Sequence, residues 1–177
     1  MGTVQHSNTL IWAGILAAAT LIGSYGLACI FPFAAVAALA ALTLDWRNGA
    51  LLVGAVWLGN QAVGYGLLDY PVDSYSLSRG VALGVGAITA FVVAKAVAGR
   101  WTLAWPQALL ALAAAFVTQQ GVTFIDAVFS GSAENYALPI VGQVALNDAL
   151  WFAGLALVKL GLDRIQPATV RPTQFVR

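Results

Sequence analysis

The residues best able to do chemistry in this chain are carboxamides that interrupt long apolar runs. Three runs each hold one polar pair, and the pairs are Asn60–Gln61, Gln119–Gln120 and Asn147–Asp148. Polar side chains are costly inside a membrane, where they usually face a partner or a cavity. If the runs are helices, Asn60, Gln120 and Asn147 all lie about eight residues, or about 12 Å, below the outer end of their helix. This shared depth favours a ligand pocket lined from three helices, and hydrogen bonding between helices is the alternative.

Two of these pairs extend along one helix face. Tyr65 follows Gln61 by four residues, which puts both side chains on one side of a helix. Gln143 and Asn147 have the same spacing. Carboxamides both donate and accept hydrogen bonds, so they suit a ligand rimmed with amide groups. The pocket residues predicted in this way are Asn60, Gln61, Tyr65, Gln120, Gln143 and Asn147.

A polar segment, Asp69–Arg79, joins two of the apolar runs on the same outer side. It contains Tyr70 and Tyr75, whose rings combine an apolar body with a hydrogen-bonding hydroxyl. We predict that the segment is a lid over the pocket and that both tyrosines contact the ligand. The alternative is the belt of amphipathic aromatic residues found at membrane interfaces.

The chain has one cysteine, Cys29, at the outer end of the first apolar run and three residues before Pro32. A lone cysteine in an apolar helix is commonly just a small hydrophobic residue. Near the mouth of a pocket, however, a thiolate is able to ligate a soft or borderline metal that a substrate carries. Cys29 is therefore a candidate metal ligand.

Other chemistries are excluded by residue type. The single histidine, His6, precedes the first apolar run, so no histidine-based triad or metal cluster forms within the helices. The chain has no G-x-S-x-G, Walker-type or H-E-x-x-H motif. We expect a protein that is not an enzyme, has no cofactor of its own and, with a net charge of +1, binds no nucleic acid. Asp148 is expected to be paired or capped within the bundle.

Composition identifies the elements that must position these side chains. Hydrophobic residues make up 60% of the chain and charged residues 8%, a balance typical of integral membrane proteins. Continuous apolar runs of about 20 residues suit helices that cross about 30 Å of hydrocarbon. The sequence therefore predicts an all-α bundle of six transmembrane helices, at residues 9–31, 32–44, 50–68, 77–98, 105–128 and 139–162.

The second of these helices is unusual because, at about 13 residues, it is too short to cross the hydrocarbon upright. Pro32 favours a break that separates it from the first helix. We expect the second helix to be short or tilted. One transmembrane domain then covers residues 1–162, and residues 163–177 form a polar C-terminal tail.

Charge orients the predicted bundle. Every Lys and Arg except Arg79 lies on the side of the two termini; these residues are Arg47, Lys95, Arg100, Lys159, Arg164, Arg171 and Arg177. The opposite side carries Asp69, Asp73, Asp126 and Glu134. Since positive residues stay cytoplasmic, both termini are predicted to be cytoplasmic and the pocket to face outward.

The run Pro32–Leu42, a short charged turn and the run Gly49–Gly54 together resemble S-components of energy-coupling-factor (ECF) vitamin transporters. The resemblance implies a six-helix protein of a bacterial cytoplasmic (inner) membrane that captures a vitamin in an outward-facing cavity. It also implies a partner, an ECF energising module made of a transmembrane subunit and ATPases, although solitary members act without one.

One cysteine near an outward pocket is similar to the solitary cobalamin transporters of that family. This similarity implies cobalamin (vitamin B12) as the substrate, with Cys29 as an axial ligand of its cobalt, and Asp69–Arg79 as the lid. Two alternatives stay open. One is an S-component for another vitamin of flavin, thiamine or biotin type; the other is a bundle that scaffolds a membrane complex and transports nothing.

Overall fold

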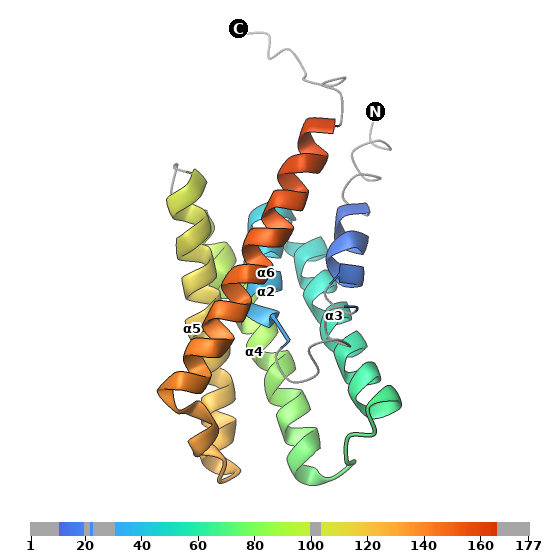
Figure 1. Ribbon diagram of the computed structural model, residues 1–177, viewed down its shortest axis with the longest axis vertical. Coiled ribbons are helices and arrows are strands. Elements are labelled where there is room, and N and C mark those ends of the chain that lie inside the picture. Colours follow the sequence, from blue (N-terminus) through green and yellow to red (C-terminus); the bar gives the residue numbers. More distant parts are fainter. Residues whose placement is uncertain (1–10, 20–21, 23–30, 100–103, 166–177) are drawn as a thin grey trace, which may run out of the picture.

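The computed structural model describes residues 11–19, 22, 31–99 and 104–165, and in these ranges the regular elements are all helices. Residues 11–19 form a helix near the N-terminus. The elements that follow are α2 (Phe33–Thr43), α3 (Trp46–Leu67), α4 (Ser74–Ala98), α5 (Ala104–Phe129), the short 3₁₀ helix η1 (Ala133–Tyr136) and α6 (Leu138–Ile165). Figure 1 shows the long helices side by side in one bundle.

Helices α3, α4, α5 and α6 are each long and apolar enough to span a membrane. Their outward faces carry large apolar side chains such as Leu58, Val117 and Leu150, which suit contact with lipid. The prediction of an all-α, multi-pass membrane bundle is confirmed to this extent. The six-span count and the side of the termini stay predictions, because residues 20, 21 and 23–30 of the first predicted helix lie outside the described part.

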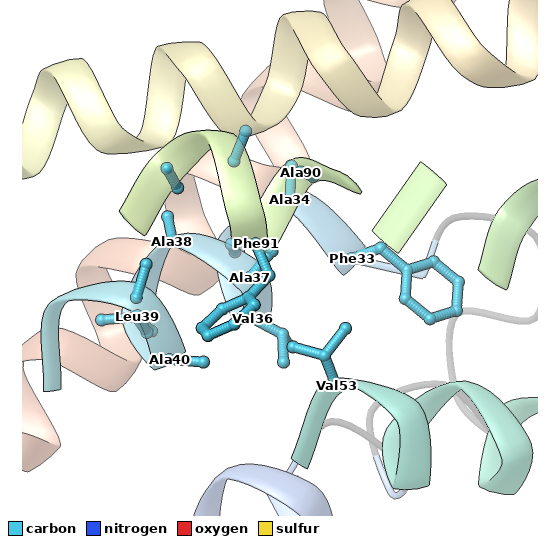
Figure 2. Close-up of a cluster of buried hydrophobic side chains, with 14 of the residues drawn as sticks. Phe33, Ala34, Val36, Ala37, Ala38, Leu39, Ala40, Val53, Ala90 and Phe91 are labelled. Atoms are coloured by element: carbon cyan, nitrogen blue, oxygen red, sulfur yellow. The ribbon is translucent and has the colours of Figure 1, made fainter. Parts of the chain in front are cut away.

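Helix α2 is short, as predicted, and lies at the centre of the bundle. Its 11 residues reach about 16 Å, or about half of the hydrocarbon thickness. The whole stretch Phe33–Ala41 is buried, in contact with α3, α4, α5 and α6. Figure 2 shows the buried side chains of α2 in one cluster with Val53 of α3 and with Ala90 and Phe91 of α4. Small side chains let helix backbones approach closely in a membrane, which explains the alanine-rich composition of α2.

Both ends of α2 are bound by charged side chains from other helices. At the N-terminal end the backbone N–H of Ala35 donates to Oδ1 of Asp148 on α6, at 2.9 Å. At the C-terminal end Nζ of Lys95 on α4 donates to the carbonyl oxygen of Ala41, at 2.6 Å. These side chains satisfy backbone groups at the two helix ends, and the Lys95 ammonium also complements the helix dipole. Asp148 is thus paired within the bundle, as the sequence predicted.

Helices α3 and α4 begin with aspartate caps that fix where each span starts. The backbone N–H of Asn48 donates to Oδ1 of Asp45 at 2.9 Å, and that of Ser76 donates to Oδ1 of Asp73 at 2.7 Å. The Asn48 N–H also holds the pKa of the exposed Asp45 carboxyl below its ordinary value. The spans predicted from the sequence begin four residues later for α3 and three residues later for α4, because that prediction followed only the apolar runs.

Large side chains of α3 pack against glycines of α4. A Cβ added at Gly84 would lie 2.5 Å from the Trp57 ring, so only glycine leaves room there. The Trp57 Nε1–H donates to the carbonyl oxygen of Gly80 at 2.8 Å, which fixes the register of the two helices. This contact brings the C-terminal half of α3 against the start of α4 and forms one wall of the cavity described next.

Candidate functional site

A cavity of about 400 Å³ lies between α3, α4, α5 and α6, in the half of the bundle that carries the α3–α4 and α5–α6 connections. In Figure 1 this is the lower end, opposite the helix of residues 11–19 and the end of α6. Its polar lining residues are Asn60, Tyr70, Arg79, Gln119, Gln120, Thr123, Asn135, Tyr136 and Asp148. The volume falls in the lower part of the range of about 300–1,000 Å³ that small-molecule sites occupy.

The inner limit of the cavity is the start of α2. Phe31 and Phe33 line it there, with ring centroids 4.3 Å apart. Asp148 lines the same region, and its carboxylate accepts the Ala35 N–H at the first turn of α2. Apolar rings and a capped helix terminus therefore meet at the depth where the sequence placed the carboxamides.

Gln119 has an amide with no hydrogen-bond partner among the described residues. Its side chain is only 4% exposed, and neither Nε2 nor Oε1 is paired. The amide lies against Gly86 of α4, where an added Cβ would be 3.0 Å from both atoms. Buried polar groups are nearly always hydrogen-bonded in native proteins, so the unpaired Gln119 amide is the clearest indication of a missing ligand or water.

Arg79 lines the cavity near the start of α4 and joins three elements. One guanidinium nitrogen donates to Oδ2 of Asp126 and to the carbonyl oxygen of Thr123 on α5, both at 3.1 Å. The other donates to the hydroxyl of Tyr136 on η1 at 3.4 Å, and the guanidinium carbon lies 5.6 Å from the centre of that ring. Arg79 thus holds η1 against α5, with its charge balanced by Asp126.

Three of the predicted site residues line the cavity: Asn60, Tyr70 and Gln120. They come from α3, from the connection after it and from α5. Tyr70 belongs to the segment predicted to be a lid, and its ring packs edge-on against Tyr65 with centroids 6.4 Å apart. Most of that segment is not a loop, since α4 starts at Ser74.

Gln61 and Tyr65 lie at the contact between α3 and α4, beside the cavity rather than among its lining residues. The Gln61 Nε2 donates to Oδ1 of Asn60 at 3.2 Å, and the Tyr65 hydroxyl is 3.2 Å from the Ser76 hydroxyl. Both side chains face Gly80, which leaves room for them. Both side chains therefore belong to the contact between α3 and α4, and Gln61 also binds Asn60 directly.

The remaining predicted residues do not line the cavity. Gln143 is exposed on α6, Tyr75 is 46% exposed at the start of α4, and Asn147 is half-buried on α6 beside Asp148. Cys29, the predicted metal ligand, lies outside the described residues.

Sequence reasoning missed Gln119, Arg79 and Tyr136 as cavity residues. Depth alone selected Gln120 from its pair, although adjacent residues on a helix point about 100° apart. Arg79 had a usable signal, because it is the one cation on the acidic side and Asp126 is a possible partner. Tyr136 had the weaker signal of a tyrosine in a connection on that same side, and its place in the cavity depends on how η1 folds back.

The polar lining of the cavity offers amide, hydroxyl and guanidinium groups, which bind ligands by hydrogen bonds. No protein-family model matches this chain, and no curated protein or solved structure matches it either. The resemblance to vitamin-transporter S-components therefore stays a prediction.

Proposed function

We propose that this protein takes up a vitamin across a bacterial cytoplasmic membrane, capturing it in the outward half of the bundle as an S-component does. The observation that supports this is the cavity of about 400 Å³ lined by the carboxamides of Asn60, Gln119 and Gln120. Polar side chains gathered around a cavity within a membrane bundle are typical of a ligand site.

The same observation argues against a purely structural bundle. Carboxamides that hold helices together pair with groups on a neighbouring helix. Gln119 instead has both amide atoms unpaired within the described residues and lines the cavity. A bundle that only scaffolds a complex gives no reason for burying this amide without a hydrogen-bond partner.

Cobalamin remains the proposed substrate, with Cys29 as the cobalt ligand and the cavity amides meeting the peripheral amides of the corrinoid. The cavity volume favours the alternative, a smaller vitamin of flavin, thiamine or biotin type, because a corrinoid greatly exceeds the drug-sized ligands that such a volume encloses. A corrinoid would insert one edge and extend outward past Tyr70 and Tyr136.

Release on the cytoplasmic side needs an energy source. The sequence has no nucleotide-binding motif, so ATP hydrolysis would belong to an ECF energising module bound through the membrane. Uptake without such a module is the alternative that the resemblance to solitary transporters supports.

The test is a thermal-shift screen of the detergent-solubilised protein with cyanocobalamin, riboflavin, thiamine and biotin. One vitamin is expected to raise the unfolding temperature, since a ligand at 100 times its Kd adds about 2.7 kcal/mol of stability. Asn60→Ala should weaken that vitamin's binding about tenfold, whereas Asn48→Ala, at the inner end of the same helix, should leave its Kd unchanged. If none of the four vitamins stabilises the protein, the proposal is wrong.

The cobalt ligand has a separate readout. If Cys29 binds cobalt, the absorption spectrum of cobalamin should change on binding to the wild-type protein and not to Cys29→Ala. A Cys29→Ala variant with full affinity, together with an unchanged spectrum for the wild type, contradicts the ligand role while leaving vitamin uptake in place.

A further inference from the structure

The guanidinium of Arg79 lies in the wall of the cavity. Two other residues of the lining bind it: the carbonyl oxygen of Thr123 accepts from Nη1 at 3.1 Å, and the Tyr136 hydroxyl accepts from Nη2 at 3.4 Å. The Arg79 side chain nevertheless keeps 25% of its surface exposed. The guanidinium is therefore held in a fixed position and stays open to contact.

Asp126 neutralises Arg79 from another side. Its carboxylate accepts from Nη1 of Arg79 at 3.1 Å and from the Ser78 hydroxyl at 3.0 Å. Asp126 and Ser78 line a second groove, between α4 and α5, and neither residue lines the cavity. Of these two hollows, Arg79 lines only the cavity. The pair has no net charge, but it presents its cation to the cavity and its anion to the groove.

Arg79 also has unused hydrogen-bond donors. A guanidinium carries five N–H groups, and three of them donate, to Thr123, Asp126 and Tyr136. The Nε–H and one N–H of Nη2 have no partner among the described residues. Guanidinium donors lie in one plane, with a geometry that matches the paired oxygens of a carboxylate or a phosphate.

The other charge in the cavity wall indicates how such a group is oriented. Arg79 and Asp148 are the two charged residues among the described residues of the lining. Asp148 lies where α2 begins, since its carboxylate accepts the Ala35 N–H at 2.9 Å. A negative group on a ligand would meet a like charge at Asp148 and a cation at Arg79. The favourable orientation therefore directs the anionic end of the ligand toward Arg79.

We infer that Arg79 is a specificity-determining residue of the cavity and that its unused guanidinium donors bind an anionic group of the substrate, a carboxylate or a phosphate. The inference rests on the proposed function, because it names the substrate class that the same cavity selects. Biotin carries a carboxylate, and the phosphate esters of riboflavin and thiamine carry a phosphate. A neutral group at this place makes weaker hydrogen bonds with the guanidinium, and a cationic group is repelled.

The test compares pairs of probes that differ in one anionic group. The pairs are biotin methyl ester and biotin, riboflavin and its 5′-phosphate, thiamine and its monophosphate, and dicyanocobinamide and its phosphate. In a pair that binds, the anionic member should bind the wild-type protein at least about tenfold more tightly, as expected for hydrogen bonds to a charged group. Added salt should reduce this preference, because it screens the charges.

Three variants separate ligand binding from a structural role. Arg79→Gln should bind both members of a pair alike. Asp126→Asn keeps the cation and removes the competing carboxylate, so its preference for the anionic member should be at least as large as in the wild type. Lys159→Gln is the matched control, because it breaks the other ion pair of the described residues, with Asp163 on α6, and should leave the preference unchanged.

The outcomes separate the two proposals. If a pair binds the wild type with no preference for its anionic member, Arg79 does not recognise an anion and the proposed function still stands. A preference that survives in Arg79→Gln overturns the inference in the same way. The comparison in the wild type needs no variant, so it decides even where Arg79→Gln fails to fold. If no member of any pair binds the wild-type protein, both proposals fail.

Discussion

At the scale of single residues, Gly86 decides which glutamine of the pair on α5 is buried. The missing side chain at this position lets the Gln119 amide enter the space between α4 and α5. Gln120, one residue later, is turned about 100° away around the helix and keeps partial exposure. A buried amide therefore lies beside one that is partly exposed, and only the first bears the full cost of desolvation.

Gly86→Ala tests this arrangement. The new Cβ would displace the Gln119 amide by a few tenths of an ångström, and if the adjoining cavity binds a vitamin as proposed, we expect its Kd to rise about fivefold, or by about 1 kcal/mol. The unfolding temperature should change little, since alanine favours helices more than glycine does. Gly54→Ala, where the added Cβ meets nothing within 4 Å, is the control. An unchanged Kd in Gly86→Ala would show that the position of this amide does not affect binding.

At the scale of elements, α2 is a half-length helix whose terminal groups are satisfied from outside. Its N-cap residue, Pro32, makes no side-chain hydrogen bond, so Asp148 of α6 takes the place of an ordinary cap. Lys95 of α4 does the same at the other end. A short helix ending inside a membrane needs such partners, because no water is present to satisfy its terminal N–H and C=O groups.

We therefore expect Asp148→Ala to be strongly destabilising. It leaves the Ala35 N–H buried without its acceptor, which should cost about 1–3 kcal/mol. Asp148→Asn keeps an acceptor oxygen and should recover part of that loss. Chemical unfolding in detergent, followed by circular dichroism, measures both. Equal stability of the alanine variant and the wild type would show that the cap does not hold α2 in place.

Sequence reasoning found the elements better than it found the contacts between them. Run length and composition were enough for the four spanning helices and the short α2, since both follow directly from local composition. Asn60 and Gln120, which were selected by their depth along a helix, are among the residues that line the cavity. The depth of a residue does not tell, however, in which direction its side chain points around the helix axis. The Gln61 side chain points toward α4, where Gly80 makes room for it. The four-residue spacing shared by Gly80–Gly84 and Trp57–Gln61 was the one local signal of that contact.

At the scale of the whole molecule, the apolar and polar residues divide as expected for a membrane bundle with an internal site. Large apolar side chains point outward on the spanning helices, while Gln119, Thr123 and Asp148 are buried inside. The acidic connections and the cavity share one end of the bundle. Charge asymmetry predicts that this end faces away from the cytoplasm.

The orientation is testable with a single reactive cysteine. In a Cys29→Ser background, Glu134→Cys on η1 should react in whole cells with a maleimide that does not cross membranes, because η1 is predicted to be outside. Arg47→Cys, in the first turn of α3, should react only after the membrane is permeabilised. The reverse pattern would invert the predicted topology and turn the cavity toward the cytoplasm.

The point at which α2 begins also sets the depth of the cavity. Helix α2 is long enough to cross about half of the hydrocarbon thickness, and Phe31 and Phe33 at its start line the cavity. Each helical turn added before Phe33 would move the start of α2 by about 5.4 Å. A shift of Pro32 along the sequence would thus change the cavity volume, with the surrounding long helices left as they are.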